Sequence, residues 1–239
     1  MRIDRRNLIR RAAQLAGCAC TLSLSRLAGA SSGASEPRRG SGPIDAATSL
    51  KRLKEGNRHF CQHKFHYPHQ SVAWREKIAN EQKPFAVVLG CSDSRVPPEI
   101  IFDEGLGDLF VIREAGHVAD DATIASIEYA VGHLGVPLVM VLGHEQCGAV
   151  KATVDAVISH TPPPGHMSRL VDDIRPAVVS ARNRPGDLLD LAVRVNTAFV
   201  VSQLQKSGPL LNRYVEQGRV KVVGAYYGLH TGRVDLIEA

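Results

Sequence analysis

Two short clusters of this 239-residue sequence carry side chains of the types that bind zinc in proteins. The run CSDSR begins at Cys91, and the run HEQC extends from His144 to Cys147. Two thiolates and one imidazole form a ligand set that zinc accepts in tetrahedral geometry, and three protein ligands leave a fourth position open. An open position is typical of a catalytic zinc. Each cluster alone is weak evidence, because cysteines at strand ends are more often small buried residues.

Each cluster directly follows an apolar run that reads as a buried strand. Residues 85–90 form FAVVLG after Pro84, and residues 138–142 form LVMVL after Pro137. Strands of a parallel sheet that is covered on both faces are nearly continuous apolar runs. Sites in such sheets form beyond the carboxyl ends of the strands, where the strand order reverses. If the two strands are neighbours, the two clusters face one another.

The remaining chain alternates between strand and helix patterns. Further strands are expected at 109–112, 220–226 and 234–237, and helices at 46–62, 71–82, 120–134, 148–159, 168–182 and 187–206. This alternation predicts an α/β fold with a central, mostly parallel β-sheet, flanked by helices. Four strands should be parallel, with a short edge strand beside them, and residues 46–62 form an N-terminal helical arm. Pro176 should either kink the helix at 168–182 or begin it.

Composition and charge exclude several classes of protein. An apolar fraction of 44% and a charged fraction of 22% are typical of a globular protein. No apolar run reaches the roughly 18 residues of a membrane helix, so no membrane span is expected. The formal charge of +5 comes from the first forty residues, where eight arginines face only Asp4 and Glu36. The rest is near neutral, and no nucleic-acid partner is expected.

The N-terminus reads as an export signal. Residues 1–30 resemble a twin-arginine signal peptide, with the pair Arg5 and Arg6 before Asn-Leu-Ile and a small-residue cleavage site at Ala28-Gly29-Ala30. Residues 31–45 form a flexible linker, and residues 46–239 form the domain. The protein is then periplasmic or secreted. Two alternatives to a cleaved export signal remain: a basic helix that stays attached, and a lipoprotein cleavage box ending at Cys18.

The longer motifs resemble the β-carbonic anhydrase family. They are GCSDSRVPPE, REAGH, EYAVGHLGVPLVMVLGHEQCGAV and the tail VKVVGAYYGLHTGRVDLI, and the likeness covers roughly Leu50 to the C-terminus. The resemblance implies a zinc lyase that reversibly hydrates carbon dioxide to bicarbonate and a proton through a zinc-bound hydroxide. It also implies a homodimer or a higher homo-oligomer, in which the helix from Ala46 to Phe60 could grip the neighbouring subunit.

The resemblance assigns roles to particular residues. Cys91, His144 and Cys147 match the zinc ligands, and Asp93 and Arg95 match the catalytic dyad. Asp93 either pairs with Arg95, which leaves water on the zinc, or binds the zinc itself and closes the site. Arginine is able to hold the carboxylate away, because a bidentate pair is strong.

Substrate contacts are expected from Ser92, Val96 and Gly148. Val96 would line a small dry pocket for carbon dioxide. Gly148 would leave the metal uncrowded, because glycine has no side chain.

Other residues leave alternatives open. His117 stands where the family often has asparagine, and it is either a proton shuttle or a pocket-edge residue without a role. His63, His66 and His69 read as surface or interface residues rather than a second metal site. Cys61 reads as a buried helix residue that faces the core or a partner subunit.

Two rival functions use the same motifs. A related hydrolase would act on carbon disulfide or carbonyl sulfide. A non-catalytic module would bind zinc or bicarbonate, although such a module needs no Asp93 and Arg95 pair.

Overall fold

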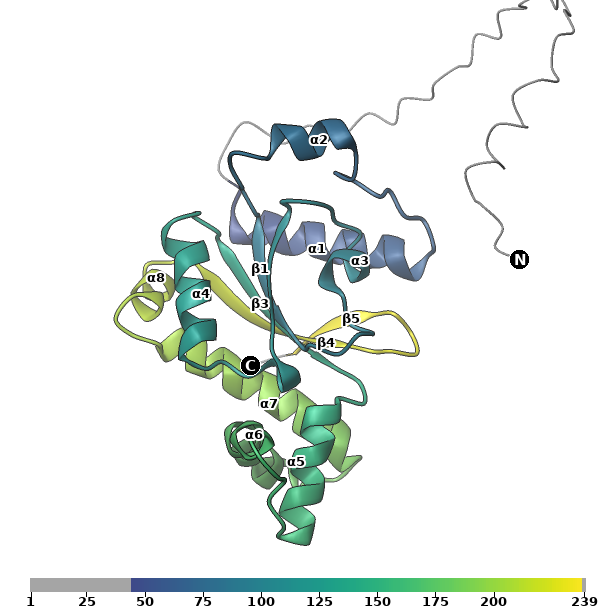
Figure 1. The fold of residues 1–239 in the computed structure, drawn as a ribbon, viewed down its shortest axis with the longest axis vertical. Helices are drawn as coiled ribbons and strands as arrows, with labels where there is room; N and C mark the ends of the chain where they lie inside the picture. The colour runs from purple at the N-terminus through teal and green to yellow at the C-terminus, as the bar shows by residue number, and fades with distance from the viewer. Residues whose placement is uncertain (1–43, 238–239) are drawn as a thin grey trace, which may run out of the picture. The chain divides into compact units, whose positions relative to one another are not determined.

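The described part of the chain, residues 44–237 of a computed structural model, is built on one five-stranded sheet with the order β2-β1-β3-β4-β5 (Figure 1). The strands are β1 (Ala86–Gly90), β2 (Leu109–Arg113), β3 (Leu138–His144), β4 (Lys221–Tyr227) and β5 (Val234–Ile237). The first four are parallel, and β5 runs antiparallel to β4. The predicted α/β class and sheet composition are confirmed. The predicted signal and residues 31–43 of the predicted linker lie outside the described residues.

Helices cover both faces of the sheet (Figure 1). Side chains alternate along each strand, so that Val88 packs on α1 (Ala46–Cys61) and α3 (Pro98–Ile101), whereas Val87 packs towards α4 (Asp121–Gly132), α7 (Leu188–Lys206) and α8 (Leu211–Glu216). The strands are therefore buried from both sides, which is why each reads as an unbroken apolar run.

Three helices form a third packed group, with α5 (Gly148–Ser159) and α6 (Met167–Ala181) lying against α7 (Figure 1). Its apolar core includes Cys91 and Cys147. Pro176 lies inside α6, which continues on both sides of it, so the helix does not begin there. Within residues 44–237, no helix combines the length and apolar character that crossing a bilayer requires.

The helix boundaries follow local chemistry. The carboxylates of Asp45, Asp120 and Asp187 accept hydrogen bonds from backbone N–H groups three residues later and begin α1, α4 and α7. The predicted helix at 71–82 is shorter, because α2 (Val72–Lys77) is followed by residues 79–83, which offer no apolar side chain larger than alanine. Single-turn α3 and short α8 were not predicted, because a helix this short contains too few residues to display a periodic apolar pattern.

The N-terminal helical arm packs on its own chain. Leu53 of α1 is completely buried, and a Cβ atom on Gly56 would lie 1.7 Å from the carbonyl oxygen of Phe102, so only glycine permits this close approach. The Asn57 side chain donates to the carbonyl oxygens of Ile101 and Gly232, at 3.2 and 2.8 Å. These contacts fix α1 against the segment after α3 and the turn before β5.

Candidate metal centre

The zinc-binding side chains meet at the carboxyl edge of the sheet. β1 and β3 pair in parallel, with Gly90 opposite Leu142, so the two strands are neighbours and the condition for the clusters to face one another is met. Cys91 directly follows β1, His144 ends β3, and Cys147 immediately precedes α5. One ligand atom from each of these three side chains lies within 4.8 Å of the others, and all three residues are buried.

The imidazole of His144 is oriented for metal binding. Its Nδ1 lies 2.9 Å from the main-chain oxygen of Glu145, and that oxygen only accepts, so Nδ1 carries the proton. Nε2 is then an acceptor, it is buried, and among the described residues no donor reaches it. A buried acceptor without a partner requires an explanation, and a metal ion supplies one, because ligating histidines use their second nitrogen in this way.

A hydrogen bond between the two cysteines places a negative charge on Cys91. The Cys147 thiol donates to the Cys91 sulfur, which lowers the pKa of Cys91 to about 3, and the same bond raises the pKa of Cys147. The backbone N–H of Gly116 also donates to the Cys91 sulfur, at 3.3 Å. Two sulfurs and a free imidazole nitrogen are the ligand set of a catalytic zinc site, so the residues present fit that metal.

Asp93 and Arg95 form a bidentate pair beside the cluster. The Nε and Nη2 groups of Arg95 donate to the two carboxylate oxygens at 2.9 and 2.7 Å, and its backbone N–H donates to Oδ1 at 2.9 Å. The guanidinium hydrogen bonds hold the pKa of Asp93 well below its usual range. Of the two positions that the sequence left open for Asp93, the structure has the one paired with Arg95.

A further arginine, which sequence reasoning missed, holds the CSDSR loop. Arg113 ends β2, and its side chain donates to the carbonyl oxygens of Cys91 and Asp93 at 3.0 and 2.6 Å. The hydroxyl of Ser92 donates back to the carbonyl oxygen of Arg113 at 3.0 Å. The signal was available, because a charged residue at the carboxyl end of a neighbouring strand belongs to the same edge of the sheet.

Val96 and Gly148, two residues expected to contact the substrate, lie in contrasting environments. Val96 is completely buried in the core cluster that contains Leu53 and Val88. Gly148 is exposed, and a Cβ atom there would meet no atom within 4 Å, so nothing in this chain requires glycine for space. The roles of Ser92, Val96 and Gly148 towards a substrate stay predictions.

His117 is not at a pocket edge, and that expectation is wrong. It is completely buried, and its Nε2 lies 3.1 Å from both Asn196 Nδ2 and Thr197 Oγ1 on α7. Gly116 and His117 both have positive φ, 72° and 46°, which turns the chain inward. Burial lowers the pKa of His117 to about 4, so the imidazole is neutral near pH 7 and unsuited to exchanging protons with solvent.

The predicted exposure of the remaining histidines and of Cys61 agrees with the structure at some positions and not at others. His63 and His66 are exposed, as expected. His69 is buried, which contradicts its assignment to the surface: its Nδ1 lies 2.6 Å from Asp108 Oδ2, and its ring stacks on Trp74 at 3.8 Å between centroids. Cys61 ends α1 half-buried, and burial raises the pKa of its thiol.

A mostly parallel β-sheet that carries this ligand set at its carboxyl edge places the chain among α/β proteins with a zinc site. Comparison with known proteins gives its family. Residues 86–234 match the carbonic anhydrase family. Carbonic anhydrase 2 of Mycobacterium tuberculosis is 43% identical over 186 residues, which cover 78% of this chain and 90% of that protein. Carbonic anhydrase of Pseudomonas aeruginosa is 34% identical over 181 residues, with 72% and 81% covered.

Solved structures agree with this assignment. The β-carbonic anhydrase of Coccomyxa, in complex with acetazolamide, superposes with a TM-score of 0.63 at 27% identity and covers 79% of this chain and 86% of its own. A tetrameric β-carbonic anhydrase of Sordaria macrospora shares the fold, with a TM-score of 0.64 at 22% identity and coverage of 80% and 98%. The chain belongs to the β-class carbonic anhydrase family, as the resemblance predicted.

The ligand set predicts the effect of removing one sulfur. Cys147→Ser should weaken zinc binding by more than the roughly 10–100-fold that loss of an outer-shell partner causes. Zinc retained per chain after dialysis against metal-free buffer measures this, and Cys61→Ser, which removes a thiol outside the cluster, should retain zinc like the unchanged chain. Equal retention by the two variants would show that Cys147 is not a ligand.

Proposed function

We propose that this chain is a carbonate dehydratase, which reversibly hydrates carbon dioxide to bicarbonate and a proton. One observation carries the proposal: a buried Cys91-His144-Cys147 cluster with a free imidazole nitrogen lies beside an ionised, arginine-held aspartate. Membership of the carbonic anhydrase family supports it independently.

The chain would hold zinc through the Sγ atoms of Cys91 and Cys147 and the Nε2 atom of His144. Bound zinc supplies a Lewis acid that lowers the pKa of a water molecule towards about 7. Asp93 is the orienting group: its oxygens retain lone pairs after pairing with Arg95, so it accepts a hydrogen bond from the attacking water molecule. Arg113 fixes the backbone of Asp93 and so the direction of that hydrogen bond.

Asp93 orients the water molecule rather than removing its proton. Its pKa lies well below its usual range, so the carboxylate stays ionised throughout the neutral range and is a poor base. His117 is buried and neutral, and it is not placed to receive the proton. The side chain of Arg95 is 53% exposed, which leaves the dyad open to water, so the proton passes to solvent and buffer.

Removal of the charge on Asp93 tests this assignment. Asp93→Asn should lower kcat/KM for carbon dioxide hydration by about 10²-fold or more, because an amide offers Arg95 one acceptor oxygen instead of two and no charge. Zinc content should stay at the level of the unchanged chain. Asp155→Asn, which removes an exposed carboxylate paired with Lys151, is the matched control and should leave the rate unchanged.

The hydration rate of the unchanged chain tests the proposal that the protein is a carbonate dehydratase. Its hydration rate should rise between about pH 6.5 and pH 9, through the titration of the activated water. Zinc-loaded protein that hydrates no carbon dioxide at any of these pH values would overturn the proposed function. Turnover of carbonyl sulfide or carbon disulfide by the same sample would then identify the rival hydrolase.

We also propose that the chain forms a homodimer or a larger assembly of dimers. The family resemblance supports this, and the S. macrospora relative is described as tetrameric. Light scattering on the full chain should give a mass of at least twice 25.9 kDa. A monomer at micromolar concentration would contradict the proposal.

We further propose that residues 1–30 direct twin-arginine export to the periplasm or beyond. The sequence supports this through Arg5 and Arg6, which precede a modestly apolar stretch and a small-residue cleavage site. Arg5→Lys with Arg6→Lys should abolish recovery from the periplasm of a host with this pathway. The matched control is the neighbouring pair, Arg10→Lys with Arg11→Lys, which should still be exported. Equal export of both variants would contradict the proposal.

A further inference from the structure

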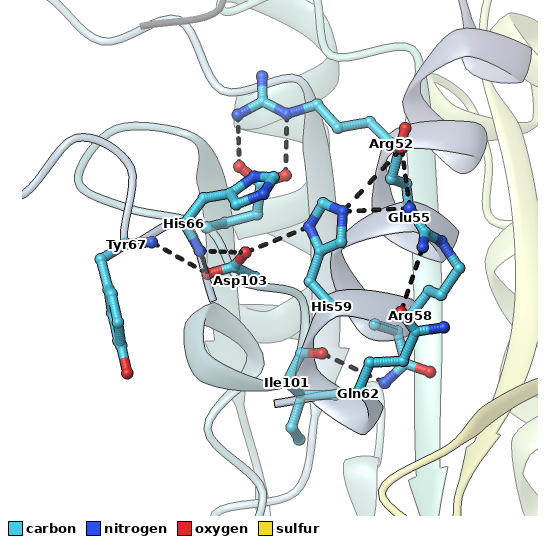
Figure 2. A network of polar contacts seen from close by, with 11 residues as sticks. Arg52, Glu55, Arg58, His59, Gln62, His66, Tyr67, Ile101 and Asp103 are labelled. Carbon is cyan, nitrogen blue, oxygen red and sulfur yellow. Dashed lines mark hydrogen bonds and ion pairs between the residues drawn. The ribbon is translucent and has the colours of Figure 1, made fainter. Parts of the chain in front are cut away.

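A second group of metal-binding side chains lies outside the Cys-His-Cys centre. It consists of His59 near the end of α1, His66 in the following loop and Asp103, two residues after the end of α3 (Figure 2). One nitrogen from each imidazole and one carboxylate oxygen lie within 4.8 Å of one another. We call these three residues the His-His-Asp cluster.

The spacing of the cluster suits a shared ion. His59 Nδ1 lies 3.3 Å from Asp103 Oδ2, which is longer than a well-formed N–H···O hydrogen bond. It matches the roughly 3.3–3.5 Å between two N or O ligands of a tetrahedral zinc ion with bonds of about 2.0–2.2 Å. The rings of His59 and His66 lie 4.1 Å apart between centroids and are tilted by 49°, so the two imidazoles contact each other, and one nitrogen of each lies within 4.8 Å of the Asp103 carboxylate.

The backbone orients that carboxylate. Asp103 is buried, and the N–H groups of His66 and Tyr67 donate to its oxygens at 2.9 and 3.2 Å. Asp103 and Tyr67 both have left-handed backbone conformations, with φ of 48° and 49°, which is uncommon for an aromatic residue. Strained backbone of this kind persists where the surrounding structure requires it, and it concentrates at ligand sites.

A structural ion pair alone would not explain the His66 ring. The loop is already tied to Asp103 through the main-chain N–H of His66, and His59 Nδ1 already contacts the carboxylate. The exposed ring of His66 nevertheless lies against His59 (Figure 2). Two imidazoles and one carboxylate are a ligand set that divalent zinc accepts, and the exposed side at His66 leaves room for water in a fourth position.

The other nitrogen of His59 has a partner available for the metal-bound state. Metal binding at Nδ1 would leave a proton on Nε2, and ligating histidines usually donate that proton to a carboxylate or carbonyl oxygen. Glu55, one turn earlier on α1, has its Oε1 atom 4.0 Å from His59 Nε2. Arg58 Nη2 lies 3.3 Å from the same nitrogen and 3.2 Å from that oxygen, so the guanidinium must turn away for Nε2 to donate to Glu55.

We propose that the His-His-Asp cluster binds a second zinc ion, distinct from the one at the Cys-His-Cys centre. This ion ties together α1, the loop that follows it and the segment after α3. Its role is to stabilise the N-terminal helical arm on the sheet, and it takes no part in hydration.

Calorimetric titration of the untagged, full-length, zinc-loaded protein with Zn²⁺ tests the proposal. The unchanged chain should take up one further ion per chain. His66→Ala should weaken this uptake by at least about tenfold, because it removes a ligand while keeping the main-chain contacts to Asp103. His63→Ala is the matched control, an exposed histidine three residues earlier in the same loop, and it should bind like the unchanged chain.

Thermal unfolding gives an independent readout. Excess Zn²⁺, at about 100 times its dissociation constant, should raise the midpoint by about 5–10 °C in the unchanged chain and in His63→Ala, but not in His66→Ala. Carbon dioxide hydration should be equal in all three proteins, so failure of this proposal is separate from failure of the proposed function. No further uptake, or uptake that His66→Ala leaves unchanged, would overturn the second site.

Discussion

The parallel pairing of β1 with β3 is the constraint on which the metal centre depends. Two strands that run in the same direction end at the same edge, so Cys91 and His144 leave the sheet side by side. β4 continues the pairing as far as His144, and the backbone N–H of Glu145 then donates to the Tyr227 carbonyl oxygen at 2.9 Å. This bond begins the turn that returns Cys147 to the other two ligands.

The carboxyl ends of β1 and β2 and the loops that follow them supply the compensating donors. A buried pair of sulfurs and an ionised aspartate concentrate negative charge, which is stable in a protein interior only when hydrogen bonds and positive charge meet it. Arg113 comes from the end of β2, Gly116 from the loop that follows, and Arg95 from the CSDSR loop itself. The strand order β2-β1-β3 therefore brings the ligands and the groups that stabilise them to one edge.

The two metal-binding clusters depend on different kinds of packing. Behind the Cys-His-Cys centre, α7 approaches β3 so closely that a Cβ atom on Gly143 would lie 2.3 Å from Thr197 Oγ1. The His-His-Asp cluster needs α1 to dock near Phe102, which Gly56 permits. The Cys-His-Cys centre thus depends on the sheet, and the His-His-Asp cluster depends on a helix that packs against the sheet.

The sequence by itself determined the strands, the family and the Cys-His-Cys ligand set. Strands buried on both faces must be continuous apolar runs, and the two motifs directly follow such runs, so local pattern carried the information. The tertiary structure alone decided which polar residues are buried and which distant residues meet. The sequence suggested a proton shuttle or a pocket-edge residue for His117 and a surface or interface residue for His69, yet α7 and Trp74 cover them. His59 attracted no attention in the sequence, and Asp103 meets His66 across 37 residues. Such contacts depend on how helices and loops dock, and no periodic pattern along the chain records that docking.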